Sequence, residues 1–202
     1  MPKKQTDEER VLTLARKQKV LRIKDLTAQG IHPEPLRRLL QKGVLTRSTR
    51  GVYHLTEGEF SEKLGLAEVA KRVPQGVFCL LTALQFHNIG TQQPHEVWLA
   101  VAREAWKPKL DYPRLRVMRF SGKALTEGVE KHTIEGVPAQ VTTPAKTVAD
   151  CFKYRNKVGL DVALEALREC WRARKATMDE FWKCAKVCRV SNVIKPYLES
   201  LT

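Results

Sequence analysis

The sequence has no apolar stretch long enough to cross a membrane as a helix. Its longest apolar runs cover residues 77–81 and 97–102, whereas a spanning helix needs about 18 or more apolar residues. Lys3 and Lys4 are followed directly by the acidic stretch 7–9, with no apolar segment between them. We therefore expect neither a signal peptide nor an association with membranes.

Cysteine pairing motifs are also missing. The sequence has five cysteines, an odd number, and no Cys-x-x-Cys pair. Cys184 and Cys188 lie one helical turn apart, but no histidine follows His132 to complete a zinc site with them. We expect buried free thiols, no bound metal and a cytoplasmic location.

Signatures of common enzyme classes are absent as well. The Gly-x-Ser-x-Gly and phosphate-loop patterns do not occur, and no two histidines are spaced as metal ligands on a helix. Glu165 and Glu169 lie one turn apart and, with Asp150, would suit a metal-dependent nuclease, an alternative that stays open. Solvated acids beside arginines on a helix face explain the pair more simply. We expect no enzymatic activity and no cofactor.

What the sequence has in excess is positive charge. The 36 Lys and Arg residues against 22 Asp and Glu give a formal net charge of +14. The excess is larger in residues 1–60 and 151–202 than in the middle of the chain. A basic surface attracts phosphate backbones, so a nucleic acid is the first partner class to consider.

The first sixty residues have the element order of a winged helix-turn-helix. Thr6 and Glu9 form a capping pattern that predicts the start of a first helix. A short second helix is expected over 24–29, and a third over 34–42 that ends at Gly43. Residues 44–55 then read as a strand, a turn and a strand.

Two basic surfaces accompany this order. In the third helix Leu36, Leu39 and Leu40 form an inward stripe, so Arg37, Arg38 and Gln41 should project outward, where such side chains can match bases and phosphates. The second basic surface is the hairpin tip, or wing. Our candidates for DNA contact are Arg22, Lys24, Arg37, Arg38, Gln41, Arg47, Ser48, Thr49 and Arg50.

The remainder predicts a larger mixed α/β (α+β) domain that ends in helices, so we expect domains at 1–60 and 61–202. Strands are expected at 96–101, 115–120, 129–134 and 137–141. Helices are expected at 61–73, 77–86, 143–152, 160–174, 177–187 and 191–201.

A third basic surface is expected near the C-terminus. Residues 153–157 read as a basic exposed loop, and Arg168, Arg172 and Lys175 recur at the spacing of one helix face. The candidates for a partner surface are Arg155, Lys157, Arg168, Arg172, Arg174 and Lys175.

Three stretches carry a family resemblance: the winged helix ending in RGVY at 50–53, LLTALQFHNI at 80–89, and IEGVP at 134–138 leading to TPAKTVAD at 143–150. Their order resembles the AbiEi antitoxins of bacterial type IV toxin–antitoxin systems. The resemblance covers roughly residues 7–170, and none of the stretches is a catalytic signature.

The resemblance implies a protein of abortive infection and phage defence with two functions. The winged helix would repress its own operon by binding duplex operator DNA. The C-terminal antitoxin domain would counter a nucleotidyltransferase-like toxin without forming a stable complex. An RNA- or tRNA-binding protein remains the main alternative, because the same basic surfaces suit an RNA backbone, and both monomer and dimer remain open.

Overall fold

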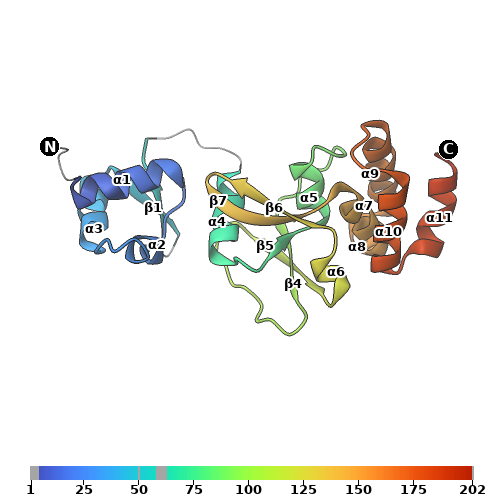
Figure 1. Cartoon of the computed structure of the whole chain (residues 1–202), viewed down its shortest axis with the longest axis horizontal. Helices are drawn as coiled ribbons and strands as arrows, with labels where there is room; N and C mark the ends of the chain where they lie inside the picture. Colours follow the sequence, from blue (N-terminus) through green and yellow to red (C-terminus); the bar gives the residue numbers. More distant parts are fainter. Residues whose placement is uncertain (1–4, 50, 58–62, 202) are drawn as a thin grey trace. The chain divides into compact units, whose positions relative to one another are not determined.

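The computed structural model describes residues 5–49, 51–57 and 63–201 and has a mixed α+β fold, as predicted (Figure 1). Contacts divide the chain into two compact units, residues 1–74 with 133–139 and residues 75–132 with 140–202. The predicted domain boundary at residue 60 falls among residues 58–62, which lie outside the described part. No helix within the described ranges is long and apolar enough to span a membrane.

The first unit contains the predicted helices and hairpin. They are α1 (Asp7–Lys17), α2 (Ile23–Thr27), α3 (Glu34–Gln41), β1 (Leu45–Thr49), β2 (Val52–Leu55) and α4 (Leu64–Arg72). Thr6 caps α1, and Glu9 completes the predicted capping box. Before α2, Leu21 forms an isolated antiparallel bridge with Tyr53. The core is formed by the apolar faces of α1, α2, α3 and the hairpin.

Polar contacts attach α4 and a hairpin tip to this unit. The Lys71 ammonium lies 3.0 Å from Asp25 Oδ2 and donates to Gln18 Oε1. Lys19 Nζ lies 2.8 Å from Glu135 Oε2 in the turn at 135–136. Gly136 follows with φ +75°, and a Cβ there would lie 2.1 Å from the Lys17 carbonyl oxygen, so only glycine fits this turn.

A five-stranded sheet is the centre of the second unit, in the order β5-β4-β3-β7-β6 (Figure 1). Its strands are β3 (Val77–Phe78), β4 (Val97–Ala102), β5 (Leu115–Phe120), β6 (Val129–Ile134) and β7 (Val137–Thr142). β3 pairs antiparallel with β4 and parallel with β7, and β4 pairs parallel with β5. The tip of the β6–β7 hairpin, residues 133–139, is counted with the first unit.

The helices of this unit surround one central helix, α7 (Pro144–Lys153). The others are α5 (Leu80–Phe86), α6 (Lys123–Thr126), α8 (Arg155–Val158), α9 (Leu160–Arg172), α10 (Met178–Cys188) and α11 (Ser191–Glu199). Thr143 caps α7, and Pro144 occupies its first turn. α7 contacts α5, α9, α10 and α11, and residues 145–152 are all buried.

Two sequence expectations about these elements are wrong. The helix predicted over 77–86 is a short strand, β3, followed by α5, because Val77 and Phe78 pair with strands on both sides. Leu80 adopts φ +50° directly after the strand and begins the helix. The basic loop predicted over 153–157 contains the short helix α8.

Candidate nucleic-acid interface

Helix α3 has the two faces that its sequence predicts. Leu36 and Leu39 are each only 2 % exposed and pack in the core of the first unit. Arg37, Arg38 and Gln41 are exposed on the other side of the helix. The apolar stripe therefore fixes the rotation of α3 and leaves two guanidinium groups and an amide directed to solvent.

The two arginines remain available to a ligand. Arg37 has no side-chain partner within the described residues. Arg38 Nε lies 3.7 Å from Glu34 Oε1, and both side chains are about half exposed. Such a loose surface pair contributes about 0–1 kcal/mol, so a phosphate or a base edge can replace the glutamate.

Acidic side chains mark one limit of this surface. Asp7, Glu8 and Glu34 line a groove at the start of α3, together with His32 and Arg38. Glu8 also pairs with Lys42 at 2.7 Å. Repulsion by these carboxylates would direct a nucleic acid away from the first turn of α3.

The predicted wing is present as the antiparallel hairpin β1–β2. Its register is regular from Leu45 opposite Leu55 to Arg47 opposite Tyr53, and shifts before Thr49. Arg47 and Ser48 are exposed. Arg50 and the side chain of Thr49 lie outside the described residues.

The two candidates at α2 differ in position. Lys24 is exposed. Arg22 is half-buried, and its guanidinium donates a 3.0 Å hydrogen bond to the Lys71 carbonyl of α4. In this conformation Arg22 attaches α4 to the first unit, and Lys24 is the more accessible cation.

The predicted basic face near the C-terminus is only partly present. Arg168 and Arg172 are exposed on α9, which ends at Arg172. Arg174 follows in the left-handed conformation with φ +51° and is exposed. The chain turns here, so the prediction that Lys175 continues the helix face is wrong. Its ammonium donates to the carbonyls of His87 and Asn88.

Two further candidates lie at α8. Arg155 is half-buried, and its guanidinium donates a 3.0 Å hydrogen bond to the Phe152 carbonyl at the end of α7. Lys157 is exposed, with its ammonium 5.6 Å from the centre of the Tyr154 ring. Arg155 therefore has a local structural contact, whereas Lys157 is directed to solvent.

The carboxylates of the nuclease hypothesis do not form one cluster. Glu165 accepts from the Thr91 hydroxyl at 3.0 Å, and Glu169 accepts from the Gly90 amide at 2.5 Å. Both hold the loop that follows α5. Asp150 instead pairs with Lys146. Across residues 5–49, 51–57 and 63–201, no group of three or more His, Cys, Asp or Glu residues is arranged to hold a metal ion.

The pairing of Lys146 with Asp150 was not predicted from the sequence. The Lys146 ammonium lies 4.9 Å from the centre of the Phe120 ring, and Cys188 Sγ donates to Asp150 Oδ1 at 3.2 Å. Burial raises the pKa of the neighbouring Cys188 thiol well above its ordinary range. The carboxylate is thus fully partnered, and the thiol stays protonated and unreactive.

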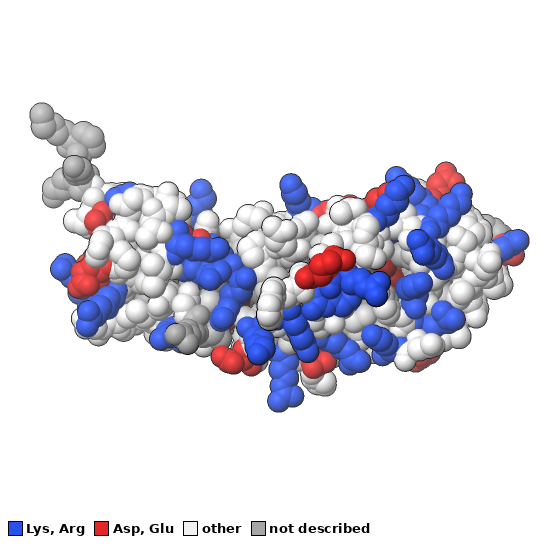
Figure 2. All heavy atoms as spheres, turned by 90° about the horizontal axis from the view of Figure 1, so that it is seen from below, with Lys and Arg blue, Asp and Glu red and all other residues white. Residues whose placement is uncertain are grey.

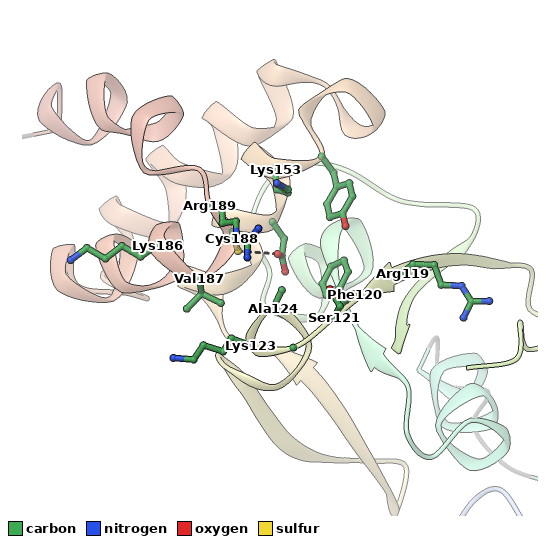
Figure 3. A pocket seen from close by; sticks show the side chains of 13 residues that line it. Arg119, Phe120, Ser121, Lys123, Ala124, Lys153, Lys186, Val187, Cys188 and Arg189 are labelled. Atoms are coloured by element: carbon green, nitrogen blue, oxygen red, sulfur yellow. Dashed lines mark hydrogen bonds between the residues drawn. The ribbon is translucent and has the colours of Figure 1, made fainter. Parts of the chain in front are cut away.

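Asp150 is one of the residues that line a pocket of about 440 Å³, several of which are basic (Figure 3). The cations come from β5, α6, α7 and α10 with their flanking residues, and are Arg119, Lys123, Lys153, Lys186 and Arg189. Figure 3 shows Arg119, Lys123 and Lys186 extending away from the pocket centre. The cations give this side of the pocket an excess of positive charge.

Comparison with protein families agrees with the geometry of the first unit. Residues 9–56, from α1 to the end of the wing, match the family described as "Transcriptional regulator, AbiEi antitoxin". No curated protein gives a match to the chain. The matched segment contains α3 and the hairpin, the two elements that carry the exposed basic residues. This segment of the chain is thus similar to the AbiEi antitoxin family of transcriptional regulators.

Proposed function

We propose that the protein is a DNA-binding autorepressor that recognises operator DNA upstream of its own gene. The observation that carries the proposal is the outward face of α3, where Arg37, Arg38 and Gln41 are exposed opposite the buried leucines. In a winged helix-turn-helix this helix enters the major groove, and the wing contacts the backbone or the minor groove. Arg47 and Ser48, which are exposed on β1, would make the second contact.

Fluorescence anisotropy with labelled duplexes tests this proposal. We expect the protein to bind upstream DNA more tightly than a scrambled duplex of the same composition at physiological salt. Both affinities should fall steeply with salt, since each phosphate contact contributes about −0.9 to the log–log slope. Equal affinity for the two duplexes would contradict specific repression.

The double variant Arg37→Ala/Arg38→Ala should abolish the preference for upstream DNA. Arg172→Ala is the matched control, because it removes an exposed arginine from a helix of the second unit. We expect the control to bind both duplexes as the unchanged protein does. A loss of preference in the control as well would point to a general charge effect.

We further propose that the second unit acts as the antitoxin against a nucleotidyltransferase-like toxin, without a stable complex. The resemblance supports this function, and the family that residues 9–56 match is described as an antitoxin. Arg168, Arg172, Arg174 and Lys157 are the exposed candidates for its surface. Arg155 and Lys175 make intramolecular contacts and are weaker candidates.

Rescue of cells that express the toxin tests the antitoxin proposal. The full-length variant Arg168→Glu/Arg172→Glu should rescue growth less well while it still binds upstream DNA. Undiminished rescue would remove this face of α9 from the mechanism. Co-purification of toxin and antitoxin in fixed stoichiometry would contradict the absence of a stable complex.

A further inference from the structure

The loop between β4 and β5, residues 103–114, exposes two large aromatic side chains. Trp106 is 96 % exposed, and Tyr112 is 69 % exposed. Tryptophan is usually well buried, because its ring loses a large apolar area from water when it packs. An indole left almost entirely in solvent is therefore a candidate contact for a ligand.

Basic residues surround these aromatic side chains along the chain. The segment 103–116 contains only two acids, Glu104 and Asp111, against five cations: Arg103, Lys107, Lys109, Arg114 and Arg116. The first four are exposed and have no ion-pair partner in the part of the chain that the structure describes. Figure 2 views the molecule from the side toward which this loop projects in Figure 1, and Lys and Arg predominate over Asp and Glu on that face.

Both ends of the loop are held by the sheet. The Arg119 guanidinium of β5 donates to the carbonyls of Ala102 and Ala105, and Ala105 directly precedes Trp106. At the other end the Val97 amide donates to the Arg114 carbonyl at 2.8 Å. Trp106 therefore projects from a fixed base, and a ligand that binds it loses less loop entropy than on a free tail.

We propose that this loop is a binding site for single-stranded nucleic acid. The Trp106 ring would stack on an unpaired base, while Lys107 and Lys109 contact the neighbouring phosphates. Alternation of exposed aromatic and basic side chains is the chemistry by which proteins hold single strands. A base inside a duplex is covered by its neighbours on both faces, so an indole gains this contact only on an unpaired base.

The site is distinct from the duplex-binding surface of the winged helix. It lies in the second unit, and none of its residues belongs to α3 or the wing. Single-stranded RNA and single-stranded DNA offer the same stacked base and phosphate chemistry. The experiment therefore compares both.

Anisotropy with labelled oligouridine and oligodeoxythymidine of about 12 nucleotides provides the test. We expect Trp106→Ala to weaken binding about fivefold or more, since stacking is worth about 1–3 kcal/mol per base. Trp106→Phe keeps an aromatic face and should stay within a few-fold of the unchanged protein. Lys107→Gln/Lys109→Gln should lower the salt slope by about 1.4, at about 0.7 for each lost phosphate contact.

The winged-helix variant separates this proposal from the proposed function. Arg37→Ala/Arg38→Ala should lose duplex preference but bind single strands normally, and Trp106→Ala should do the reverse. Equal single-strand affinity for Trp106→Ala and the unchanged protein would overturn the proposal. A change in sedimentation mass in Trp106→Ala, with oligonucleotide affinity unchanged, would identify the loop as a contact between protein chains and would also overturn it.

Discussion

The Lys146 ammonium lies 2.7 and 2.6 Å from the two carboxylate oxygens of Asp150, one turn further along α7. Neither side chain is more than 2 % exposed. A buried ion pair is costly to form, but removing one partner is costlier because it leaves an uncompensated charge in the core. The pair lies where the sheet, α7 and α10 meet, so the packing of the second unit depends on it.

Lys146→Met should destabilise the protein by about 3–5 kcal/mol, because Asp150 then loses its counter-ion. In Lys146→Met/Asp150→Leu most of this loss should be recovered, since both charges are replaced by apolar groups. Urea unfolding of the two variants and the unchanged protein measures the difference. A double variant less stable than the single one would contradict this account of the pair.

Stability should fall as the pH rises above about 9. Burial raises the pKa of the Cys170 thiol to about 12 and that of Cys184 to about 11, from an ordinary value of 9.0. Between these values the unfolded chain releases protons that the folded chain retains, so higher pH favours unfolding. Each thiol contributes at most about 1.4 kcal/mol per pH unit.

Cys170→Ala isolates this effect, because its cavity cost does not depend on pH. Urea unfolding between pH 8 and about pH 11 should give a shallower loss of stability for this variant than for the unchanged protein. Parallel curves for the two proteins would show that Cys170 does not titrate differently on folding.

Lys175 should stabilise the second unit. Lys175→Met removes the donor to the His87 and Asn88 carbonyls and should cost about 1.5–3 kcal/mol, as for a hydrogen bond from a charged group. Arg172→Ala is the matched control, because that side chain is exposed, and should change stability by less than about 0.5 kcal/mol. Equal unfolding midpoints for the two variants would show that the hydrogen bonds of Lys175 do not stabilise the second unit.

Arg38 and Arg47 should affect DNA binding differently. Arg38→Ala on α3 removes a base contact and should reduce the preference for upstream DNA by about 1–3 kcal/mol. Arg47→Ala on the wing should remove a contact to the DNA phosphate backbone. It should therefore weaken binding to all duplexes alike. Competition binding with upstream and scrambled duplexes distinguishes them, and an intact preference in Arg38→Ala would refute the assignment of α3.

The first unit could be predicted well because its signals are local. The capping box of Thr6 and Glu9, the leucine stripe of α3 and the glycine that follows it each act within one or two turns. The hairpin followed from residues adjacent in sequence. The DNA contacts predicted there remain predictions, and Arg50 lies outside the described residues.

The second unit was harder to predict because its decisive contacts join distant segments. Val77 and Phe78 form a strand only because β4 and β7 pair with them, and the apolar run alone did not distinguish strand from helix. No glycine marks the turn after Arg172, so helical spacing was extended wrongly to Lys175. The four-residue spacing of Lys146 and Asp150 can be read from the sequence. Their burial cannot, because it depends on packing against α10 and the sheet.

Hydroxyl-radical footprinting of the gene's own upstream region tests the central claim most directly. We expect the unchanged protein to protect one defined site, and Arg37→Ala/Arg38→Ala to lose this protection at the same concentration. Protection that is absent, or spread evenly along the upstream DNA, would contradict a specific winged-helix repressor.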